Sequence, residues 1–350
     1  ETGVMIKTGI IGATGYAGAE CIRLLSGHPG FEITCVVSKT FEGKKISDVY
    51  PNLSGICDLV CEPLEYAVIT EKADCFITAL PHAASQEAVY NLIAAGKKVV
   101  DLSADYRYTS ATLYESTYGL PHSYPDLLEK AIYGLPELNR EKIKDADLIA
   151  NPGCYPTCSI LGLAPLLSND LIEIDSINIS AVSGVSGAGR KASLPFSYCE
   201  VDGNFTPYKI TGHRHTTEIE EQLSIISGAS VMTGFTPHLA PIKRGMSATI
   251  YTKAKKHIST DELVTIYNMY YKDEFFIRIK DNGAIPAVKA VAGTNFADIT
   301  PIYDARLNRI IVISAIDNLG KGAASQAIQN LNIICGYNET DGLLGAGLYI

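Results

Sequence analysis

The chain has 350 residues and a mass of 37.6 kDa, which predicts about two domains at roughly 150 residues each. Hydrophobic residues make up 47% of it and charged residues 19%, so the composition excludes an intrinsically disordered protein. The net charge of −9 argues against nucleic acid and against an anionic membrane as partners, because both bind basic surfaces.

The first half of the chain alternates between predicted strands and predicted helices. Helical spacing predicts one helix from about Ala17 to Leu25, with Gly27 as its C-terminal cap, and another from about Ser85 to Ala95. Apolar runs predict strands at residues 6–11, 32–37, 74–80, 99–103 and 147–150. This alternation predicts an α/β domain with a doubly wound parallel sheet of the Rossmann type.

After about residue 150 the pattern changes to half-buried strands with few helices between them. Ser259 and Glu262 resemble a capping box that begins a helix through Tyr271. Strands are predicted at residues 177–181, 246–250, 275–279, 296–303 and 309–316, and a last helix at 321–335. These features predict a second, α+β domain with a mostly antiparallel sheet.

Gly12, Gly15 and Gly18 form a glycine-rich loop between the first predicted strand and the first predicted helix. A dinucleotide fingerprint requires this context, because glycines let backbone N–H groups approach a pyrophosphate at a helix N-terminus. Twenty residues beyond the loop, Ser38 and Lys39 stand where NAD-binding domains place an acidic residue. A hydroxyl and a cation suit a 2′-phosphate, so NADP(H) is the expected cofactor. An ordinary turn and a solvated lysine are the alternatives.

Cys154 follows the strand predicted at residues 147–150 and begins an apolar helical pattern. A helix N-terminus lowers the pKa of a thiol and favours the nucleophilic thiolate. Cys154 is therefore the candidate nucleophile, whereas Cys158, one turn further on, is expected to be a core residue. The nine cysteines show no regular pairing, which indicates reduced thiols rather than a disulfide scaffold.

Two histidines, His213 and His215, precede a helix predicted at residues 216–226. Either could act as acid and base for the thiol, and Glu218 could orient an imidazole. A zinc site made of two cysteines and two histidines is the alternative. Neither pair has the usual spacing of a zinc finger, so no metal is expected.

Arg107 and Arg190 are candidate anion-binding residues. Arg107 follows a predicted buried strand and would point into the cleft at the strand ends. Arg190 ends a second glycine-rich loop that begins at Gly184. Either guanidinium could bind a phosphate, and a surface ion pair is the alternative for each.

Together these segments resemble the N-acetyl-gamma-glutamyl-phosphate reductase family, type 1, which is related to aspartate-semialdehyde dehydrogenase. The resemblance covers almost the whole chain from Lys7. Its most specific segments surround Cys154 and His215, and the wider semialdehyde dehydrogenase group shares the segment around Asn318. The segments begin at Gly12 (Gly-Ala-Thr-Gly-Tyr-Ala-Gly), Asp101 (Asp-Leu-Ser-Ala-Asp-Tyr-Arg), Asn151 (Asn-Pro-Gly-Cys-Tyr-Pro-Thr), Gly184 (Gly-Val-Ser-Gly-Ala-Gly-Arg), Gly212 (Gly-His-Arg-His-Thr), Thr236 (Thr-Pro-His-Leu-Ala-Pro) and Asp317 (Asp-Asn-Leu-Gly-Lys-Gly-Ala-Ala).

The resemblance implies an NADPH-dependent enzyme of arginine biosynthesis that reduces N-acetyl-L-glutamyl 5-phosphate to N-acetyl-L-glutamate 5-semialdehyde and phosphate. It implies a thioester on Cys154, with His215 as acid and base, Glu218 as its orienting residue and His213 as the fallback base. Substrate contacts are expected from Arg107, Asn151, Arg190 and His213. Cofactor contacts are expected from Gly12, Thr14, Gly15, Tyr16, Ala17, Ser38, Lys39, Pro81, Ser186, Gly187 and Asn318, the last at the nicotinamide.

The resemblance also implies the domain division and the partners. Residues 1–153 and 316–350 would form the NADP-binding domain, and residues 154–315 the catalytic and oligomerisation domain of a homodimer or homotetramer. No stretch approaches the ~18 apolar residues of a membrane helix, and no signal peptide is visible. A cytoplasmic location, with neither nucleic acid nor membrane as partner, is expected.

Two other functions stay open. Another acyl-phosphate reductase could act on aspartyl phosphate or on a carrier-linked aminoadipyl phosphate. The 61 residues that separate Cys154 from His215 are too few for a typical aspartate-semialdehyde dehydrogenase, and the net charge of −9 disfavours docking of an acidic carrier. A non-catalytic NADP-sensing protein is the second alternative, and it would have no need for Cys154 and His215 in these settings.

Overall fold

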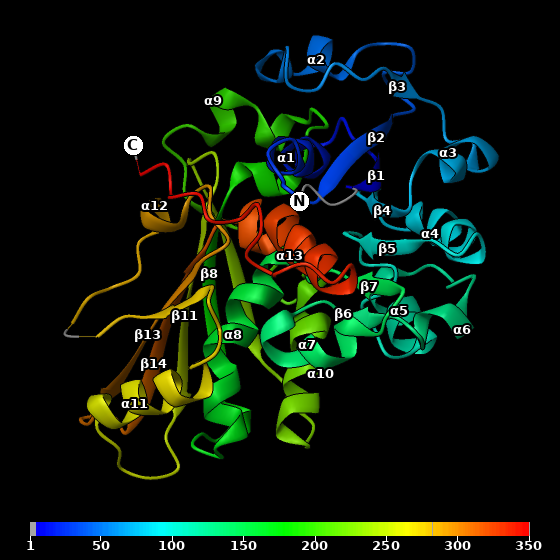
Figure 1. Ribbon diagram of the computed structural model, residues 1–350. Helices are drawn as coiled ribbons and strands as arrows, with labels where there is room; N and C mark the ends of the chain where they lie inside the picture. Colours follow the sequence, from blue (N-terminus) through cyan, green and yellow to red (C-terminus); the bar gives the residue numbers. More distant parts are fainter. Residues whose placement is uncertain (1–4, 282, 350) are drawn as a thin grey trace. The chain divides into compact units, whose positions relative to one another are not determined.

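The computed structural model describes residues 5–281 and 283–349, which form two compact units. Unit 1 comprises the residues up to Pro152 together with Ala323–Gly345, and unit 2 comprises Gly153–Gly322 and the residues from Ala346 onward. Within the described ranges, each unit is built on one seven-stranded sheet (Figure 1). No helix in these ranges is long and apolar enough to cross a membrane.

Unit 1 contains an all-parallel sheet in the order β3-β2-β1-β4-β5-β7-β6. This doubly wound order confirms the predicted Rossmann-type fold. The central strands are apolar along their length because helices cover both faces of such a sheet. The strands are β1 (Ile6–Ile11), β2 (Phe31–Val37), β3 (Cys61–Glu62), β4 (Cys75–Thr78), β5 (Lys98–Asp101), β6 (Ile132–Tyr133) and β7 (Leu148–Ala150).

The helices of unit 1 include one that is distant in sequence from the rest. Helix α13 (Ser325–Ile334) has every residue buried and packs against α1 and α7 (Figure 1). The other helices are α1 (Tyr16–Leu25), α2 (Ile46–Val49), α3 (Tyr66–Lys72), α4 (Ser85–Ala94), α5 (Ala111–Tyr118), α6 (Pro125–Leu128) and α7 (Pro136–Lys144). The last helix thus belongs to the same unit as the glycine-rich loop.

Unit 2 contains a mixed sheet in the order β12-β13-β14-β11-β8-β10-β9. Its four antiparallel pairings outnumber the two parallel ones, β8 with β10 and β12 with β13, which confirms the predicted mostly antiparallel sheet. The strands are β8 (Asn178–Gly184), β9 (Thr206–Pro207), β10 (Gly234–Ala240), β11 (Met246–Lys253), β12 (Ile277–Ile279), β13 (Ala297–Asp304) and β14 (Arg309–Ile316).

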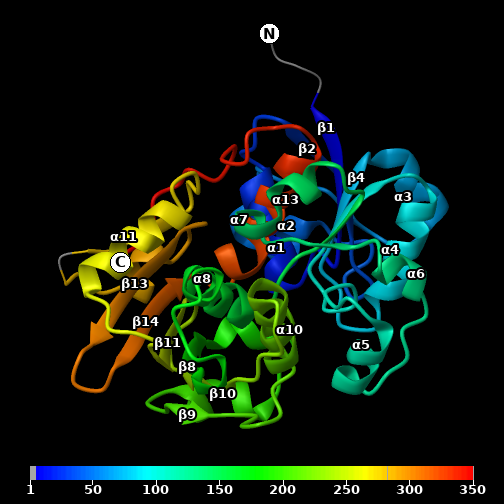
Figure 2. The ribbon, with the colours of Figure 1, turned by 90° about the horizontal axis from the view of Figure 1, so that it is seen from below.

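Two long helices of unit 2 lie side by side: α8 (Cys154–Ser168) and α10 (His215–Ser227) (Figure 2). Helix α8 packs on β11 and β14 and is apolar almost all round. The remaining helices are α9 (Tyr198–Val201), α11 (Thr260–Tyr270) and α12 (Val288–Val291). Short 3₁₀ turns span Pro51–Leu53, Ile174–Ser176, Val185–Ala188 and Leu194–Phe196, and a π-turn spans Gly320–Ala324.

Helix α8 tolerates an internal proline because another helix replaces the missing donor. Pro165 has no N–H to give to the carbonyl of Leu161. The hydroxyl of Tyr271 donates to that carbonyl at 2.7 Å, and the hydroxyl of Tyr267 donates to the carbonyl of Gly162 at 2.6 Å. The buried carbonyls are therefore satisfied, and α8 continues past the proline.

The predicted cap of one helix and the predicted start of another are wrong. Helix α1 ends at Leu25 with Ser26 as its right-handed cap, and Gly27 does not adopt the left-handed conformation predicted for it. The Ser26 hydroxyl donates to the carbonyl of Ile22 at 2.7 Å, which satisfies the helix end without glycine. Helix α10 begins at His215, so this histidine lies inside the helix rather than before it. The capping box of Ser259 is confirmed.

Candidate active site

Cys154 is the first residue of helix α8. Gly153 caps the helix in an extended conformation, and its carbonyl accepts the first helical hydrogen bond, from the N–H of Thr157 at 2.9 Å. Cys154 is half-buried, whereas Cys158 is completely buried, as predicted for a core residue. The positive end of a helix stabilises a thiolate. The position of Cys154 therefore suits a nucleophile.

Glu218 connects the beginning of α10 to the beginning of α8. Its side chain is completely buried, and its Oε1 accepts a hydrogen bond from the N–H of Gly153 at 2.9 Å. Gly153 directly precedes Cys154 in the chain. The carboxylate of Glu218 therefore holds in place the turn that presents the thiol.

His213 and His215 lie in one aromatic cluster with Tyr155, the neighbour of Cys154. The ring centroid of Tyr155 is 5.5 Å from that of His213 and 5.9 Å from that of His215. Phe235 completes the cluster at 5.3 Å from Tyr155. The fold thus brings both predicted histidines to the residue that follows the nucleophile.

The ring of His213 has a defined hydrogen bond and a lowered pKa. His213 Nδ1 accepts the backbone N–H of His215 at 3.1 Å, which leaves the proton of the neutral ring on Nε2. Burial, together with the nearby charges of Lys209 and Arg214, lowers the pKa of His213 to about 4. His213 is therefore neutral near pH 7, and its ring can donate one hydrogen bond but cannot readily accept a proton.

Tyr155 and Tyr208 are site residues that the sequence analysis missed. The Tyr208 hydroxyl donates to the Tyr155 hydroxyl at 3.1 Å, and the Tyr155 hydroxyl donates to the carbonyl of His238 at 3.3 Å. Burial raises the pKa of Tyr208 to about 12, so the pair stays protonated. Its position beside Cys154 could have singled out Tyr155, but nothing in the sequence distinguishes Tyr208 from other tyrosines.

Ser186, Gly187 and Asn318, all predicted cofactor contacts, also lie together in unit 2. Asn318 Oδ1 accepts the N–H of Gly245 at 2.6 Å, and its Nδ2 donates to Ser186 Oγ at 3.0 Å. A Cβ atom at Gly187 would lie 3.6 Å from the same Nδ2. The side-chain amide of Asn318 therefore has a fixed orientation.

The turn that carries Asn318 passes beside the thiol. A Cβ atom at Gly322 would lie only 2.7 Å from the Cβ of Cys154. The N–H of Gly322 donates to the carbonyl of Asp317 at 2.9 Å, which closes the turn. The candidate nucleophile and Asn318 thus belong to one site, where β8 and β14 end and α8 begins.

The glycine-rich loop of unit 1 has the close packing that a dinucleotide cradle requires. Gly12 has a φ of +82°, and a Cβ atom there would lie 2.4 Å from the carbonyl oxygen of Ala79. A Cβ atom at Gly18 would lie 2.4 Å from the carbonyl oxygen of Gly12. Gly15 caps α1, which begins with Tyr16 and Ala17.

The hydroxyls of Thr14 and Ser38 meet beside this loop, with 2.7 Å between their oxygens. Lys39, next to Ser38, is exposed, and so is Pro81, which follows β4. No carboxylate stands at the end of β2, where an NAD site would place one. The loop and these side chains fit a bound dinucleotide.

Arg107 and Asn151, both predicted substrate contacts, are buried in unit 1. The Arg107 guanidinium donates to the carbonyls of Asn151 and Leu102, both at 2.8 Å. The Asn151 amide donates to the carbonyl of Ala323 at 3.1 Å and accepts from Asn330 at 3.0 Å. Arg107 is thus not the surface ion pair considered as its alternative, and both residues support the backbone that leads to Cys154.

Arg190, the remaining predicted substrate contact, is exposed in unit 2. It follows Gly189, whose φ of +81° turns the chain. Residues 5–281 and 283–349 contain no group of three or more His, Cys, Asp or Glu side chains that could hold a metal ion.

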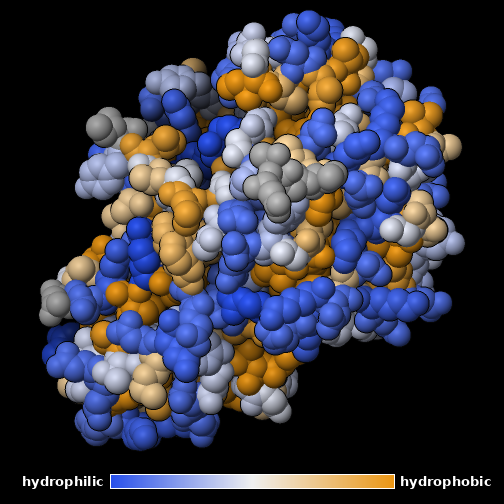
Figure 3. All heavy atoms as spheres, viewed as in Figure 1, coloured by the Kyte–Doolittle hydropathy of each residue, from blue (hydrophilic) through white to orange (hydrophobic). Residues whose placement is uncertain are grey.

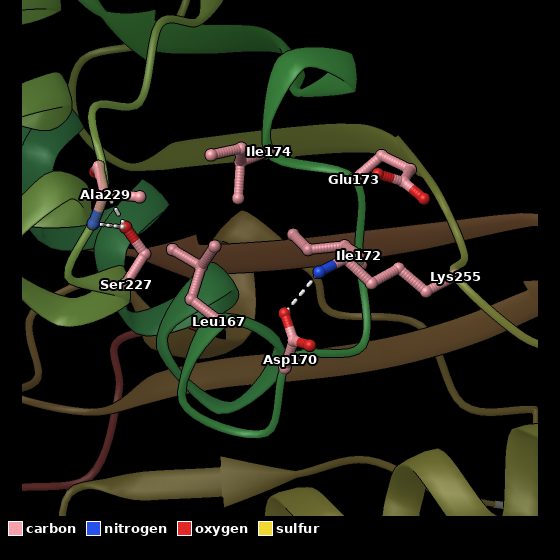
Figure 4. Close-up of a pocket in the computed structure, with 8 residues that line it drawn as sticks. All are labelled: Leu167, Asp170, Ile172, Glu173, Ile174, Ser227, Ala229 and Lys255. Atoms are coloured by element: carbon pink, nitrogen blue, oxygen red, sulfur yellow. Dashed lines mark hydrogen bonds and ion pairs between the residues drawn. The ribbon is translucent and has the colours of Figure 1, made fainter.

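A separate cavity of about 150 Å³ lies at the C-terminal ends of α8 and α10, whereas Cys154 and His215 stand at their N-terminal ends (Figure 4). Lys255 points into it and pairs with Asp170, and Ser227 and Ala229 line its other side. The 15 residues of α8 place this cavity about 20 Å from Cys154. It lacks the cysteine and the histidines of the candidate site.

Comparison with known proteins gives matches for both units. The family of the semialdehyde dehydrogenase NAD binding domain matches residues 7–146, and that of the semialdehyde dehydrogenase dimerisation domain matches residues 154–318. The N-acetyl-gamma-glutamyl-phosphate reductase of Acetivibrio thermocellus is 53% identical over 99% of this chain and 100% of its own. That of Desulforudis audaxviator is 50% identical, again over 99% and 100%.

Solved structures agree with the fold. Aspartate semialdehyde dehydrogenase II of Vibrio cholerae has a TM-score of 0.73 and 18% identity, and covers 95% of this chain and 99% of its own. Aspartate semialdehyde dehydrogenase of Candida albicans, solved with NADP, has a TM-score of 0.72 and 18% identity with the same coverage. At this identity the likeness extends to the fold alone.

Proposed function

The chain belongs to the semialdehyde dehydrogenase family and, within it, to the N-acetyl-gamma-glutamyl-phosphate reductases of arginine biosynthesis, and we propose that its reaction proceeds through a thioester on Cys154. The observation that carries this proposal is the position of Cys154 at the start of α8, beside the cluster of Tyr155 with His213 and His215. The membership makes it an oxidoreductase that acts on an acyl phosphate.

The first step is acyl transfer to sulfur. The His215 imidazole takes the proton of Cys154 Sγ, and the thiolate attacks the carbonyl carbon of the acyl phosphate. A C–S bond forms while the C–O bond to phosphate breaks, and phosphate leaves with the electron pair. The N–H groups of Cys154 and Tyr155, the first two of α8, are the candidate donors to the developing oxyanion.

Reduction then follows at the same carbon. When bound, NADPH supplies the hydride equivalent that converts the thioester to the aldehyde oxidation level. The protonated His215 returns its proton as the C–S bond breaks and the semialdehyde leaves. Glu218 keeps the turn at Gly153 in place throughout, and the neutral His213 offers its Nε2–H as a hydrogen-bond donor to the substrate.

Cofactor contacts are proposed within each unit by itself. In unit 1, the loop from Gly12 to Ala17 would receive the pyrophosphate, with Ser38 and Lys39 at the 2′-phosphate of NADP(H). In unit 2, Asn318 would contact the nicotinamide, with its amide held by Ser186. Unit 1 is accordingly the proposed cofactor domain, and unit 2 the proposed catalytic and oligomerisation domain.

The substrate contacts divide into direct and indirect ones. Arg190 is exposed and is proposed to meet an anionic group of the substrate. Arg107 and Asn151 are buried and act through the backbone, because Arg107 holds the carbonyl of Asn151, three residues before Cys154. We therefore propose that Arg107 and Asn151 are positioning residues, which the reaction needs although they do not touch the substrate.

The reaction is tested by an assay of the full chain in the oxidative direction. With N-acetylglutamate semialdehyde, phosphate and NADP, the protein is expected to form NADPH, which absorbs at longer wavelength than NADP. Aspartate semialdehyde in place of the acetylated compound is expected to give a kcat/KM lower by about 100-fold or more, and NAD in place of NADP a higher KM. Equal rates with both aldehydes would contradict the proposed substrate.

Self-association is expected through the open face of the sheet in unit 2. The surface in Figure 3 is mostly hydrophilic with apolar patches. Helix α8 covers one sheet face at Ile250 and Val312. On the opposite face, the partly exposed Ile311 and Ile313 pair across the ladder with Tyr251 and Thr249. We propose that a second copy of the chain covers this face.

Sedimentation velocity tests this surface. The wild-type chain is expected to sediment as a dimer or tetramer, and Ile313→Glu is expected to sediment as a 37.6 kDa monomer, because a charge would be buried without a partner. Ile225→Glu is the control, since Ile225 is 57% exposed on α10, and should leave the assembly intact. A monomeric wild type, or an Ile313→Glu variant that still associates, would exclude this face as the interface.

A further inference from the structure

Arg244, in the loop between β10 and β11, has a guanidinium fixed by a buried carboxylate. Its Nε lies 2.7 Å from Oδ2 of Asp317, whose side chain is completely buried. Asp317 also accepts the N–H groups of Leu319 at 2.9 Å, Gly320 at 3.2 Å and Gly293. The backbone N–H groups fill the acceptor sites of the carboxylate, and Arg244 supplies the opposite charge that a buried carboxylate requires.

The loop that contains Arg244 is bonded to the proposed cofactor contacts on both sides. The N–H of Ser186 donates to the carbonyl of Lys243 at 3.1 Å. The N–H of Gly245 donates to Oδ1 of Asn318 at 2.6 Å. Arg244 lies between these two attachments, at the end of the sheet where Gly322 packs against Cys154. It is therefore a neighbour of the reaction site in the same unit.

Exposure and charge indicate what Arg244 could bind. Its side chain is 21% exposed, against 0% for Asp317, so solvent reaches part of the Arg244 side chain but not the carboxylate that holds it. The exposed Lys243 adds a second positive charge directly before Arg244 in the chain. A planar guanidinium held in one orientation is suited to carboxylates and phosphates.

We propose that Arg244 binds an oxyanion of the substrate, either the phosphate or the carboxylate, and that Asp317 is the positioning residue that orients it. The inference rests on the proposed function, because it takes the acyl phosphate as substrate. In the oxidative direction the phosphate is a free substrate, and the carboxylate belongs to a different substrate, the semialdehyde. Their KM values can therefore be measured independently, and the affected one identifies the group that Arg244 binds.

The experiment compares Arg244→Lys and Arg244→Gln with the wild-type chain at saturating NADP. Arg244→Lys keeps the charge opposite Asp317, so it retains the ion pair and the fold while it loses the planar fork. The KM for phosphate or for semialdehyde is expected to rise by about 10-fold in Arg244→Lys and by about 100-fold in Arg244→Gln. The Kd for NADP should stay unchanged.

Lys243→Gln is the matched control, because Lys243 is exposed and carries the same charge one residue earlier. It should leave both KM values at the wild-type level. Calorimetric titration of inorganic phosphate and of N-acetylglutamate onto each variant measures the same binding without turnover. An inactive wild type would refute the proposed function, while these titrations would still test Arg244.

Three results would overturn the inference. The first is that neither KM nor either calorimetric affinity changes in the two Arg244 variants. The second is that Lys243→Gln causes an equal change, which would indicate only the general positive field. The third is that the Kd for NADP rises while both KM values stay constant, which would assign Arg244 to the cofactor.

Discussion

Replacement of Cys154 by alanine is expected to lower kcat/KM for NADPH formation by about 10⁴- to 10⁶-fold, the range seen when an enzyme loses its nucleophile. The reason is that no other group at the start of α8 can form the covalent intermediate. The measurement is the rate with N-acetylglutamate semialdehyde, phosphate and NADP. Circular dichroism should show an unchanged fold, since the half-buried thiol contributes little packing.

Cys199→Ala is the control for the loss of a thiol. Cys199 is exposed on α9, and its replacement should leave kcat/KM within about twofold of the wild-type value. With stoichiometric acyl phosphate and no cofactor, the wild-type chain should release phosphate in a burst, and Cys154→Ala should not. Full activity of Cys154→Ala would refute the thioester mechanism.

Replacement of His215 by asparagine is expected to lower kcat by about 10²- to 10⁴-fold, the contribution of general acid and base catalysis. His215 lies in the first turn of α10, in the aromatic cluster beside Cys154. Asparagine keeps a hydrogen-bonding group of similar size but cannot carry a proton. The pH profile of kcat/KM should lose the limb that reports the imidazole.

The variant His213→Asn distinguishes the role of His213 from that of His215. The pKa of His213 is lowered to about 4 by burial and by Lys209 and Arg214, so the ring does not titrate in the working range above pH 5. His213→Asn is therefore expected to raise the KM for semialdehyde while the pH profile keeps both limbs. If His213→Asn abolished the limb and His215→Asn retained it, the roles of the two residues would be exchanged.

The fold class was predictable because local patterns are consistent with it. The apolar run of β1, the glycines that follow it and the helical spacing of α1 all indicate the same strand-turn-helix unit. The strands β8, β11, β13 and β14 of unit 2 were predicted from the same kind of pattern, as was the capping box of Ser259, whereas β10 was not predicted. The short elements β3, β6 and β9 were missed, because two residues carry no measurable period.

The candidate site was predictable in part. Cys154 stands out because a helix start is visible in the sequence, and the glycine-rich loop stands out because steric close approach requires glycine. Tyr208, Arg244 and Asp317 do not stand out, because tyrosines, arginines and aspartates are common and their importance lies in what they touch.

The sequence by itself determined the two-unit organisation, the thiol at a helix N-terminus, the two histidines and the dinucleotide loop, since each is a local pattern of spacing and composition. Only the tertiary structure decided which residues surround Cys154. It made His213 a neutral imidazole and directed Glu218 to the Gly153 N–H. It also buried Arg107 in the backbone of unit 1. Burial, hydrogen-bond partners and pKa depend on contacts between segments far apart in the chain, which no local pattern encodes.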